Sequence, residues 1–191
     1  MRPFLSALAL SLVAAPAGAE DSGSKAPKVE LVTTHGSLVL ELDPANAPVT
    51  TENFLRYVRD GHYDGLIFHR VIAGFMAQAG GYDAEYRERE TRAPIENESR
   101  NGLSNERGTI AMARTNDPHS ATAQFFINLV DNERLDGSPG RWGYTVFGRL
   151  TDGLDVLDKI GAVATGRGGP FPTDVPQAPI VITQARVVDA D

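Results

Sequence analysis

The sequence of 191 residues contains no cysteine, and its Lys and Arg residues do not gather in a cluster. Without cysteine the chain can form no disulfide, no thiolate metal site and no thiol nucleophile. The net charge is −7 at pH 7, and the sequence pI is about 5.1. Nucleic-acid-binding domains usually carry a basic face, so we expect no nucleic-acid partner and interpret the acidity as a feature that favours solubility.

Several catalytic motifs are also missing. The chain has no glycine-rich phosphate loop, no G-x-S-x-G turn and no H-E-x-x-H helix. Its four histidines are scattered, and none has a second histidine at metal-ligand spacing: His35, His62, His69 and His119. We therefore expect neither a metal nor a cofactor. An enzyme with this sequence would perform a reaction that needs little covalent chemistry.

The N-terminal segment has the pattern of a signal peptide. Arg2 provides a positive charge, residues 4–15 are apolar apart from two serines, and residues 17–19 read Ala-Gly-Ala. The apolar run is shorter than the ~20 residues that a membrane-spanning helix requires. Small residues at this position favour cleavage by signal peptidase. We predict that residues 1–19 are removed and that residues 20–27 form a flexible polar leader.

The remaining chain, 28–191, is predicted to be one domain. Hydrophobic residues make up 41 % of the sequence and charged residues 23 %, as in ordinary globular proteins. Short β-like stretches fall at 29–33, 37–42, 67–71, 75–79, 109–113, 124–129, 145–150 and 180–188. Helical spacing of apolar residues occurs at 48–60, which begins with proline, and at 152–160. The pattern is mostly β with two helices, which argues against a doubly wound α/β sheet.

The segment 68–81 reads FHRVIAGFMAQAGG and suggests two strands joined by a turn. Phe75 and Met76 are consecutive, so on a regular strand their side chains point to opposite faces. Only a local twist or bulge could bring both into one pocket. Taken alone, the segment favours Phe75 and Met76 in the core and Arg70 as a surface cation, because apolar residues are mostly buried.

Further motifs change this interpretation. Residues 108–113 read GTIAMA, residues 124–128 read QFFIN, and Leu135-Asp136 precedes YTVFG at 144–148. Together with FHRVI..FM.Q.GG, these motifs resemble the cyclophilin family in order and spacing over about residues 28–188. The resemblance implies an eight-stranded antiparallel closed β-barrel capped by two α-helices. It also implies peptidyl-prolyl cis/trans isomerase activity, with a proline pocket on the outer surface of the barrel and no cofactor.

The resemblance also assigns roles to residues. Arg70 matches the catalytic arginine of the family, and His69 within the same motif is interpreted as structural. Phe75, Met76, Phe126 and Leu135 match the apolar walls of the proline pocket. The other matched substrate-binding positions are Gln78, Ala111, Met112, Ala113, Gln124 and Tyr144. The chain has Arg134 where the family often has an aromatic residue, and Tyr144 where many members have histidine.

The expected partners are proline-containing segments of unfolded or partly folded proteins. The signal peptide and the resemblance together favour the bacterial periplasm, where the enzyme would assist folding of exported proteins as a monomer. Two alternatives stay open. The same barrel could be a non-catalytic proline-binding module or chaperone, although such a module could do without Arg70. A hydrolase that uses Ser120 with His69 or His119 is the other, but adjacent residues on a strand point apart. The charged stretch 82–107 is expected to be a solvated loop.

Overall fold

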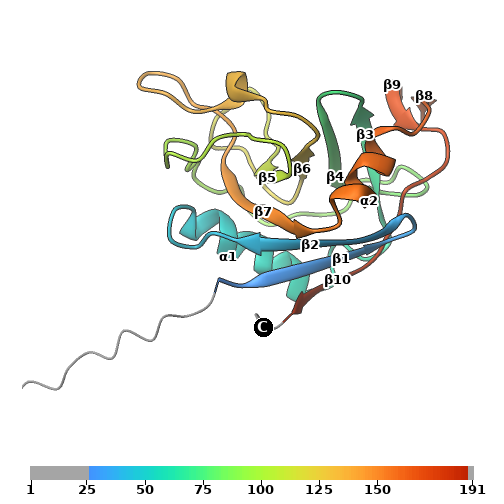
Figure 1. Ribbon diagram of the computed structural model, residues 1–191, viewed down its shortest axis with the longest axis horizontal. Helices are drawn as coiled ribbons and strands as arrows, with labels where there is room; N and C mark the ends of the chain where they lie inside the picture. The colour runs from blue at the N-terminus through green and yellow to red at the C-terminus, as the bar shows by residue number, and fades with distance from the viewer. Residues whose placement is uncertain (1–25, 189–191) are drawn as a thin grey trace, which may run out of the picture.

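The computed structural model describes residues 26–188 (Figure 1). The predicted signal peptide and most of the leader lie outside this range. The strands of the large sheet are β1 (Lys28–Thr33), β2 (Gly36–Leu42), β3 (Leu66–Ile72), β4 (Met76–Asp83), β5 (Thr109–Met112), β6 (Phe125–Asn128), β7 (Val146–Asp152) and β10 (Ile182–Val188). The helices are α1 (Pro48–Arg59), the short 3-10 turn η1 (Glu133–Leu135) and α2 (Leu154–Gly161). Among residues 26–188, no helix combines the length and the apolar character that crossing a membrane would require.

The eight strands form one sheet in the order β10-β1-β2-β7-β5-β6-β4-β3, with every ladder antiparallel. The sheet curls until its two edge strands approach each other. They join only through a bridge between Ile67 and Val181 and two backbone bonds, one of which runs from Phe68 N to Ile180 O at 2.9 Å. The predicted closed barrel is therefore an overstatement, and the sheet is a strongly curled half-barrel.

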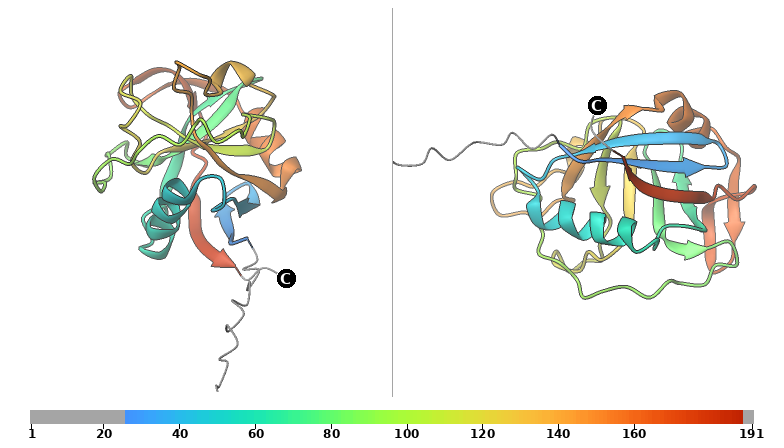
Figure 2. Two further views of the ribbon diagram at one scale, coloured as in Figure 1. Left: turned by 90° about the vertical axis from the view of Figure 1, so that its left-hand side faces the viewer. Right: turned by 90° about the horizontal axis from the view of Figure 1, so that it is seen from below.

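The interior of the curled sheet holds the main hydrophobic core. Leu38, Leu40 and Leu42 alternate along β2 and are fully buried, as their spacing predicts. Phe54 of α1 enters the same core, where its ring centroid lies 5.6 Å from that of Phe125. Burying a side chain of this size contributes about 1.5–3 kcal/mol to stability. The two helices α1 and α2 lie on opposite sides of the curled sheet (Figure 2).

A second apolar cluster lies on the outer face of the sheet. Phe125 and Ile127 of β6 point into the core, so Phe126 between them points outward. It packs there with Met76 of β4 and Ala111 of β5, and all three are buried although they face away from the barrel interior. Their cover comes from the loops around this face. The outer cluster is the feature that positions the candidate site.

Two segments depart from the sequence prediction. Residues 165–176 form an unpredicted hairpin of β8 (Thr165–Gly168) and β9 (Phe171–Pro176), which lies against β3. The stretch 82–107 is not simply a solvated loop, because Asn97, Ser99 and Asn105 within it are buried. Polar side chains of this kind form hydrogen bonds when buried, and here they bind neighbouring loops.

Glu98 of this stretch caps α1. Ala47 at the N-cap position offers no side-chain acceptor to the first turn of the helix. The Glu98 carboxylate takes that role, accepting bonds from Val49 N at 3.1 Å, from Thr50 N at 2.8 Å and from Thr50 Oγ1 at 2.7 Å. A negative charge at a helix N-terminus also interacts favourably with the helix dipole.

We expect Glu98→Ala to lower the free energy of unfolding by about 1–2 kcal/mol, because the first turn of α1 loses its acceptor and its negative charge. Urea unfolding measures the change. Glu96→Ala is the matched control, since Glu96 is an exposed glutamate two residues away. Equal effects of the two substitutions would show that Glu98 does not cap the helix.

Candidate active site

A pocket of about 230 Å³ opens on the outer face of the sheet. It is smaller than the 300–1,000 Å³ typical of pockets for drug-sized ligands, so its size suits one ring or side chain. Its walls are apolar and aromatic, with a few polar and charged groups at the edge. The lining residues are Arg70, Phe75, Met76, Gln78, Ala113, Arg114, Phe126, Leu135 and Tyr144.

The turn between β3 and β4 brings Phe75 and Met76 into the same pocket. Phe75 lies in this turn and Met76 is the first residue of β4, so the alternation of a regular strand does not separate them. Phe75 N donates to Ile72 O at 3.0 Å, which closes the turn. Gly74 has a φ of 68°, a conformation that glycine adopts without steric cost. The turn, rather than a twist or bulge within a strand, therefore brings the two side chains together.

Arg70 stands at the edge of the pocket because the β3–β4 ladder is irregular. The register shifts between Phe68 and Arg70, so Phe68 and Val71 both face the core and Arg70 faces outward. The Arg70 side chain is 45 % exposed, and its Nε lies 3.5 Å from Oδ2 of Asp174 on β9. Asp174 has a φ of 67°, a left-handed conformation that is uncommon for a residue other than glycine.

Gln78 and Gln124 lie side by side. Gln78 Nε2 donates to Gln124 Oε1 at 2.9 Å. Gln78 lines the pocket, whereas Gln124 stands behind it and packs on the backbone of Gly81. A Cβ at position 81 would lie 2.6 Å from Gln124 Nε2, so only glycine leaves room for this arrangement. The pair presents amide groups beside the apolar walls.

The three matched positions at the end of β5, Ala111, Met112 and Ala113, do not share one role. Ala113 lines the pocket, and Ala111 belongs to the outer cluster beneath it. The Met112 side chain turns into the main core, where it is 2 % exposed, so Met112 can face a substrate only through its backbone. Arg114 lines the pocket and was missed. Its position directly after the matched strip is the signal that could have found it.

Buried asparagines hold the walls in place, and sequence reasoning gave them no role. Asn132 Nδ2 donates to Phe75 O at 2.9 Å and to Asn128 Oδ1 at 2.9 Å. Asn105 Nδ2 donates to Asp136 Oδ1 at 2.8 Å, next to Leu135. These bonds tie the turn that carries Phe75 to the end of β6 and fix the loop that carries Leu135. Buried polar networks of this kind make a site rigid when every member is satisfied.

His69 lies beside Arg70 but outside the pocket. Its ring is 3 % exposed and packs against Tyr82 and Phe171, with centroids 4.9 Å and 5.6 Å away. Burial lowers the pKa of His69 to about 4, the positive charge of Arg70 acts in the same direction, and the Ile67 backbone opposes it. The histidine is therefore neutral at pH 7 and joins the β8–β9 hairpin to β3.

The arrangement of His119 and Ser120 does not support a hydrolase. The ring of His119 packs on Trp142, and its Nδ1 accepts from Asn97 N at 3.2 Å. Ser120 Oγ instead donates to Asp117 O at 2.7 Å. In the part of the chain that the structure describes, no three His, Asp or Glu side chains come together as a possible metal site.

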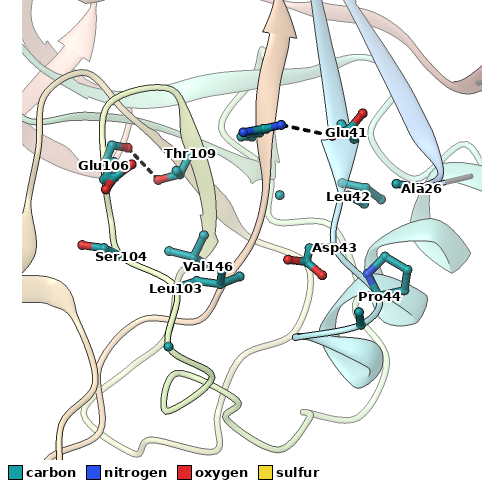
Figure 3. A pocket seen from close by; sticks show the side chains of 14 residues that line it. Ala26, Glu41, Leu42, Asp43, Pro44, Leu103, Ser104, Glu106, Thr109 and Val146 are labelled. Atoms are coloured by element: carbon teal, nitrogen blue, oxygen red, sulfur yellow. Dashed lines mark hydrogen bonds and ion pairs between the residues drawn. The ribbon is translucent and has the colours of Figure 1, made fainter.

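A larger hollow, of about 630 Å³, lies elsewhere on the surface (Figure 3). Glu41 and Asp43 reach it from the end of β2, and Leu103 and Ser104 reach it from the opposite loop. Glu41 is paired with Arg149 at 3.5 Å, and Asp43 accepts bonds from Asn46. The carboxylates of Glu41 and Asp43 thus have partners within the protein.

A curled antiparallel sheet with an apolar pocket and an arginine on its outer face matches a known class of protein. Residues 28–187 fit the family model described as cyclophilin type peptidyl-prolyl cis-trans isomerase/CLD. The chain is 56 % identical over 163 residues to peptidyl-prolyl cis-trans isomerase cyp18 of Streptomyces antibioticus, covering 84 % of this chain and 98 % of that protein. It is 52 % identical over 158 residues to peptidyl-prolyl cis-trans isomerase B of Escherichia coli, covering 81 % and 96 %.

Solved structures agree with this result. A cyclophilin-type isomerase of Cryptosporidium parvum, crystallised in the presence of the dipeptide Ala-Pro, superposes with a TM-score of 0.69 at 26 % identity, covering 85 % of this chain and 99 % of that one. A cyclophilin of Hirschia baltica gives a TM-score of 0.65 at 26 % identity, covering 83 % and 72 %. The chain belongs to the cyclophilin-type peptidyl-prolyl cis-trans isomerases, and its activity is the isomerisation of peptidyl-prolyl bonds.

The pKa of His69 makes stability depend on pH. In the unfolded chain the histidine titrates near 6.5, so between pH 6.5 and pH 4 the unfolded state binds a proton that the folded state does not. The contribution of His69 is complete above pH 6.5 and is lost as the pH falls towards 4. We expect the wild type to lose about 1.3 kcal/mol from this group between pH 7.5 and pH 5.5.

Urea unfolding at the two pH values measures this loss, with His69→Phe as the comparison. The variant keeps a ring against Tyr82 and Phe171 but cannot titrate. Burial also lowers the pKa of His62, which is present in both proteins and cancels in the difference. An equal loss in wild type and variant would contradict the assignment to His69.

Proposed function

We propose that this isomerase binds proline-containing segments of unfolded or partly folded exported proteins and assists their folding as a monomer. The observation that carries the proposal is the position of Arg70 beside the apolar pocket of Phe75, Met76, Phe126 and Leu135. The pocket has the size of one ring, and the arginine stands where the adjoining peptide bond would lie. The Ala-Pro dipeptide present with the related Cryptosporidium parvum protein supports proline as the recognised residue.

The reaction suits these groups. Rotation about a peptide bond meets a barrier of ~18–20 kcal/mol because the nitrogen lone pair takes part in amide resonance. In the twisted state that lone pair is localised on the prolyl nitrogen. A guanidinium near the nitrogen favours the twisted state, and arginine keeps its charge and holds its donors in a rigid fork. The apolar walls exclude water and so strengthen the hydrogen bond from the guanidinium to the prolyl nitrogen.

The amides of Gln78 and Gln124 have a separate task. In this proposal they hold the substrate backbone on one side of the bond while the other side rotates. An amide can donate and accept at once, so it can bind both a backbone carbonyl and an N–H group. Their mutual bond of 2.9 Å keeps the two side chains oriented before the substrate arrives.

Export rests on residues 1–19, which lie outside the described range. Their apolar run and Ala-Gly-Ala sequence support secretion, and the bacterial relatives make the periplasm the proposed compartment. Spontaneous isomerisation takes tens to hundreds of seconds, slow enough to limit folding. Proteins that fold after export would therefore gain from an isomerase in that compartment.

Two substitutions, Arg70→Ala and Phe126→Ala, distinguish an isomerase from a non-catalytic binding module. Arg70→Ala is expected to lower kcat by at least about tenfold at nearly unchanged KM, because the transition state loses its donor.

Phe126→Ala is expected to raise KM, because the bound ring loses a wall. Exchange spectroscopy of an Ala-Pro peptide measures both.

Circular dichroism of each variant controls for folding. A well-folded Arg70→Ala enzyme with unchanged kcat would contradict the role of the arginine. An unchanged KM in Phe126→Ala would remove Phe126 from the pocket walls.

For the compartment, we expect osmotic-shock fractions of cells expressing the full chain to contain a protein that begins at Glu20. N-terminal sequencing of the purified protein identifies its first residue. Substituting Ala19 by a bulky residue such as Phe should block cleavage and leave the longer form on the membrane. A protein retained in the cytoplasm with Met1 at its start would contradict export.

A further inference from the structure

Most arginines in residues 26–188 are neutralised by a carboxylate. Ion pairs hold Arg56, Arg59, Arg70, Arg87, Arg92, Arg107, Arg149 and Arg186. In the same range, four of the arginines without such a pair share one region. Arg100, Arg114, Arg134 and Arg141 all belong to or contact the loop 134–144 beside the pocket. A protein with a net charge of −7 thus gathers unpaired positive charge next to its substrate site.

Arg114 forms one side of this positive rim. Its Nε donates to Gly143 O at 3.0 Å, Nη2 to Trp142 O at 3.1 Å and Nη1 to Thr115 O at 2.8 Å. The guanidinium also lies 4.5 Å from the ring centre of Tyr144, a pocket wall. These neutral partners fix the position of the group without cancelling its charge.

Arg134 forms another part of the rim. Its guanidinium lies 4.8 Å from the ring centre of Phe75, so a cation rests on a wall of the pocket. An exposed cation stacked on an aromatic ring keeps donors free for a ligand. Arg134 therefore places positive charge directly against a wall of the pocket.

The acidic groups of this region do not cancel the rim. The carboxylate oxygens of Asp136 accept bonds from Ser104 and from Asn105, and Arg141 binds only the backbone oxygen of Asp136. Asp131 and Glu133 flank Arg134 in the sequence and are exposed, and within residues 26–188 neither forms an ion pair with it. Asp174 is paired with Arg70 on the other side of the pocket.

We propose that Arg114 and Arg134 make the enzyme select proline segments with an acidic side chain next to the proline. The inference rests on the proposed function, and it names a substrate class for the same pocket. A substrate carboxylate beside a bound proline ring reaches the rim while the ring fills the apolar walls. Exposed ion pairs contribute modestly and hydrogen bonds to charged groups contribute more, so the expected preference is about three- to tenfold in kcat/KM.

The test uses matched peptides that differ in one residue. Ala-Glu-Pro-Phe, Ala-Gln-Pro-Phe and Ala-Lys-Pro-Phe vary the residue before proline, and Ala-Pro-Glu-Phe with Ala-Pro-Gln-Phe vary the residue after it. Exchange spectroscopy gives kcat/KM for each. We expect Glu to exceed Gln, and Gln to exceed Lys, in at least one of the two positions. The advantage of Glu should shrink as the salt concentration rises from 20 mM to 500 mM, because salt screens exposed charges.

Substitutions of Arg114 and Arg134 test whether these two residues cause the preference for Glu over Gln. Arg114→Gln and Arg134→Gln should each reduce the Glu-to-Gln ratio, and the double variant should bring it close to one. Arg114→Lys and Arg134→Lys keep the charge and should retain most of the ratio. Arg59→Gln, an equal charge change on α1 away from the pocket, should leave the ratio as in the wild type.

A ratio is the readout because a packing defect would lower the rates for Glu and Gln peptides together. Equal kcat/KM for Glu, Gln and Lys peptides would overturn the inference while leaving the isomerase activity in place. A preference that survives the double variant would also overturn it. Absence of activity on every peptide, including Gln-Pro, would instead contradict the proposed function.

Discussion

The alternation of side chains along β4, β5 and β6 is the constraint on which the site depends. Each of these strands sends one set of apolar residues into the barrel and another set to its outer face. Phe125 and Ile127 belong to the inner set, and Phe126 belongs to the outer one. Apolar side chains on the outer face of a sheet are normally buried by a second layer of helices or strands. Here loops cover them only in part, and the uncovered remainder is the pocket.

The partial cover is rigid because polar groups hold it. Asn132 and Asn128 secure the turn of Phe75, and Asp136 with Asn105 secures the loop of Leu135. A pocket that is shaped before the substrate arrives loses little conformational entropy on binding. This favours a catalyst whose task is to hold one ring and stabilise a twisted amide. The same loop carries Arg134 and accepts the hydrogen bonds of Arg114, so it positions both a pocket wall and the positive rim.

Much of this arrangement could be predicted from the sequence. Short β-like stretches predict the strands of the large sheet, and the spacing after Pro48 predicts α1. The motif 68–81 identifies Arg70, Phe75, Met76 and Gln78, all of which the structure brings together. Closure of the barrel was overstated, because pairing between edge strands depends on tertiary geometry that no local pattern contains.

Other features depend on contacts between distant segments. The β8–β9 hairpin is rich in glycine and proline, so its strands lack the β-branched pattern that identifies the others, and its packing on His69 became visible only in the fold. The Met112 side chain lies in the core, so of the matched strip only Ala111 and Ala113 send side chains to the outer face. Arg134 was recognised as a departure, but its stacking on Phe75 requires the turn and the loop to meet.

A crystal structure of the mature protein with a short Xaa-Pro peptide tests the central claim most directly. The account predicts the proline ring between Phe75, Met76, Phe126 and Leu135, with the Arg70 guanidinium within hydrogen-bonding reach of the prolyl nitrogen. A ring bound in the hollow beside Glu41 and Asp43, or an Arg70 still turned to Asp174 and away from the peptide, would contradict it.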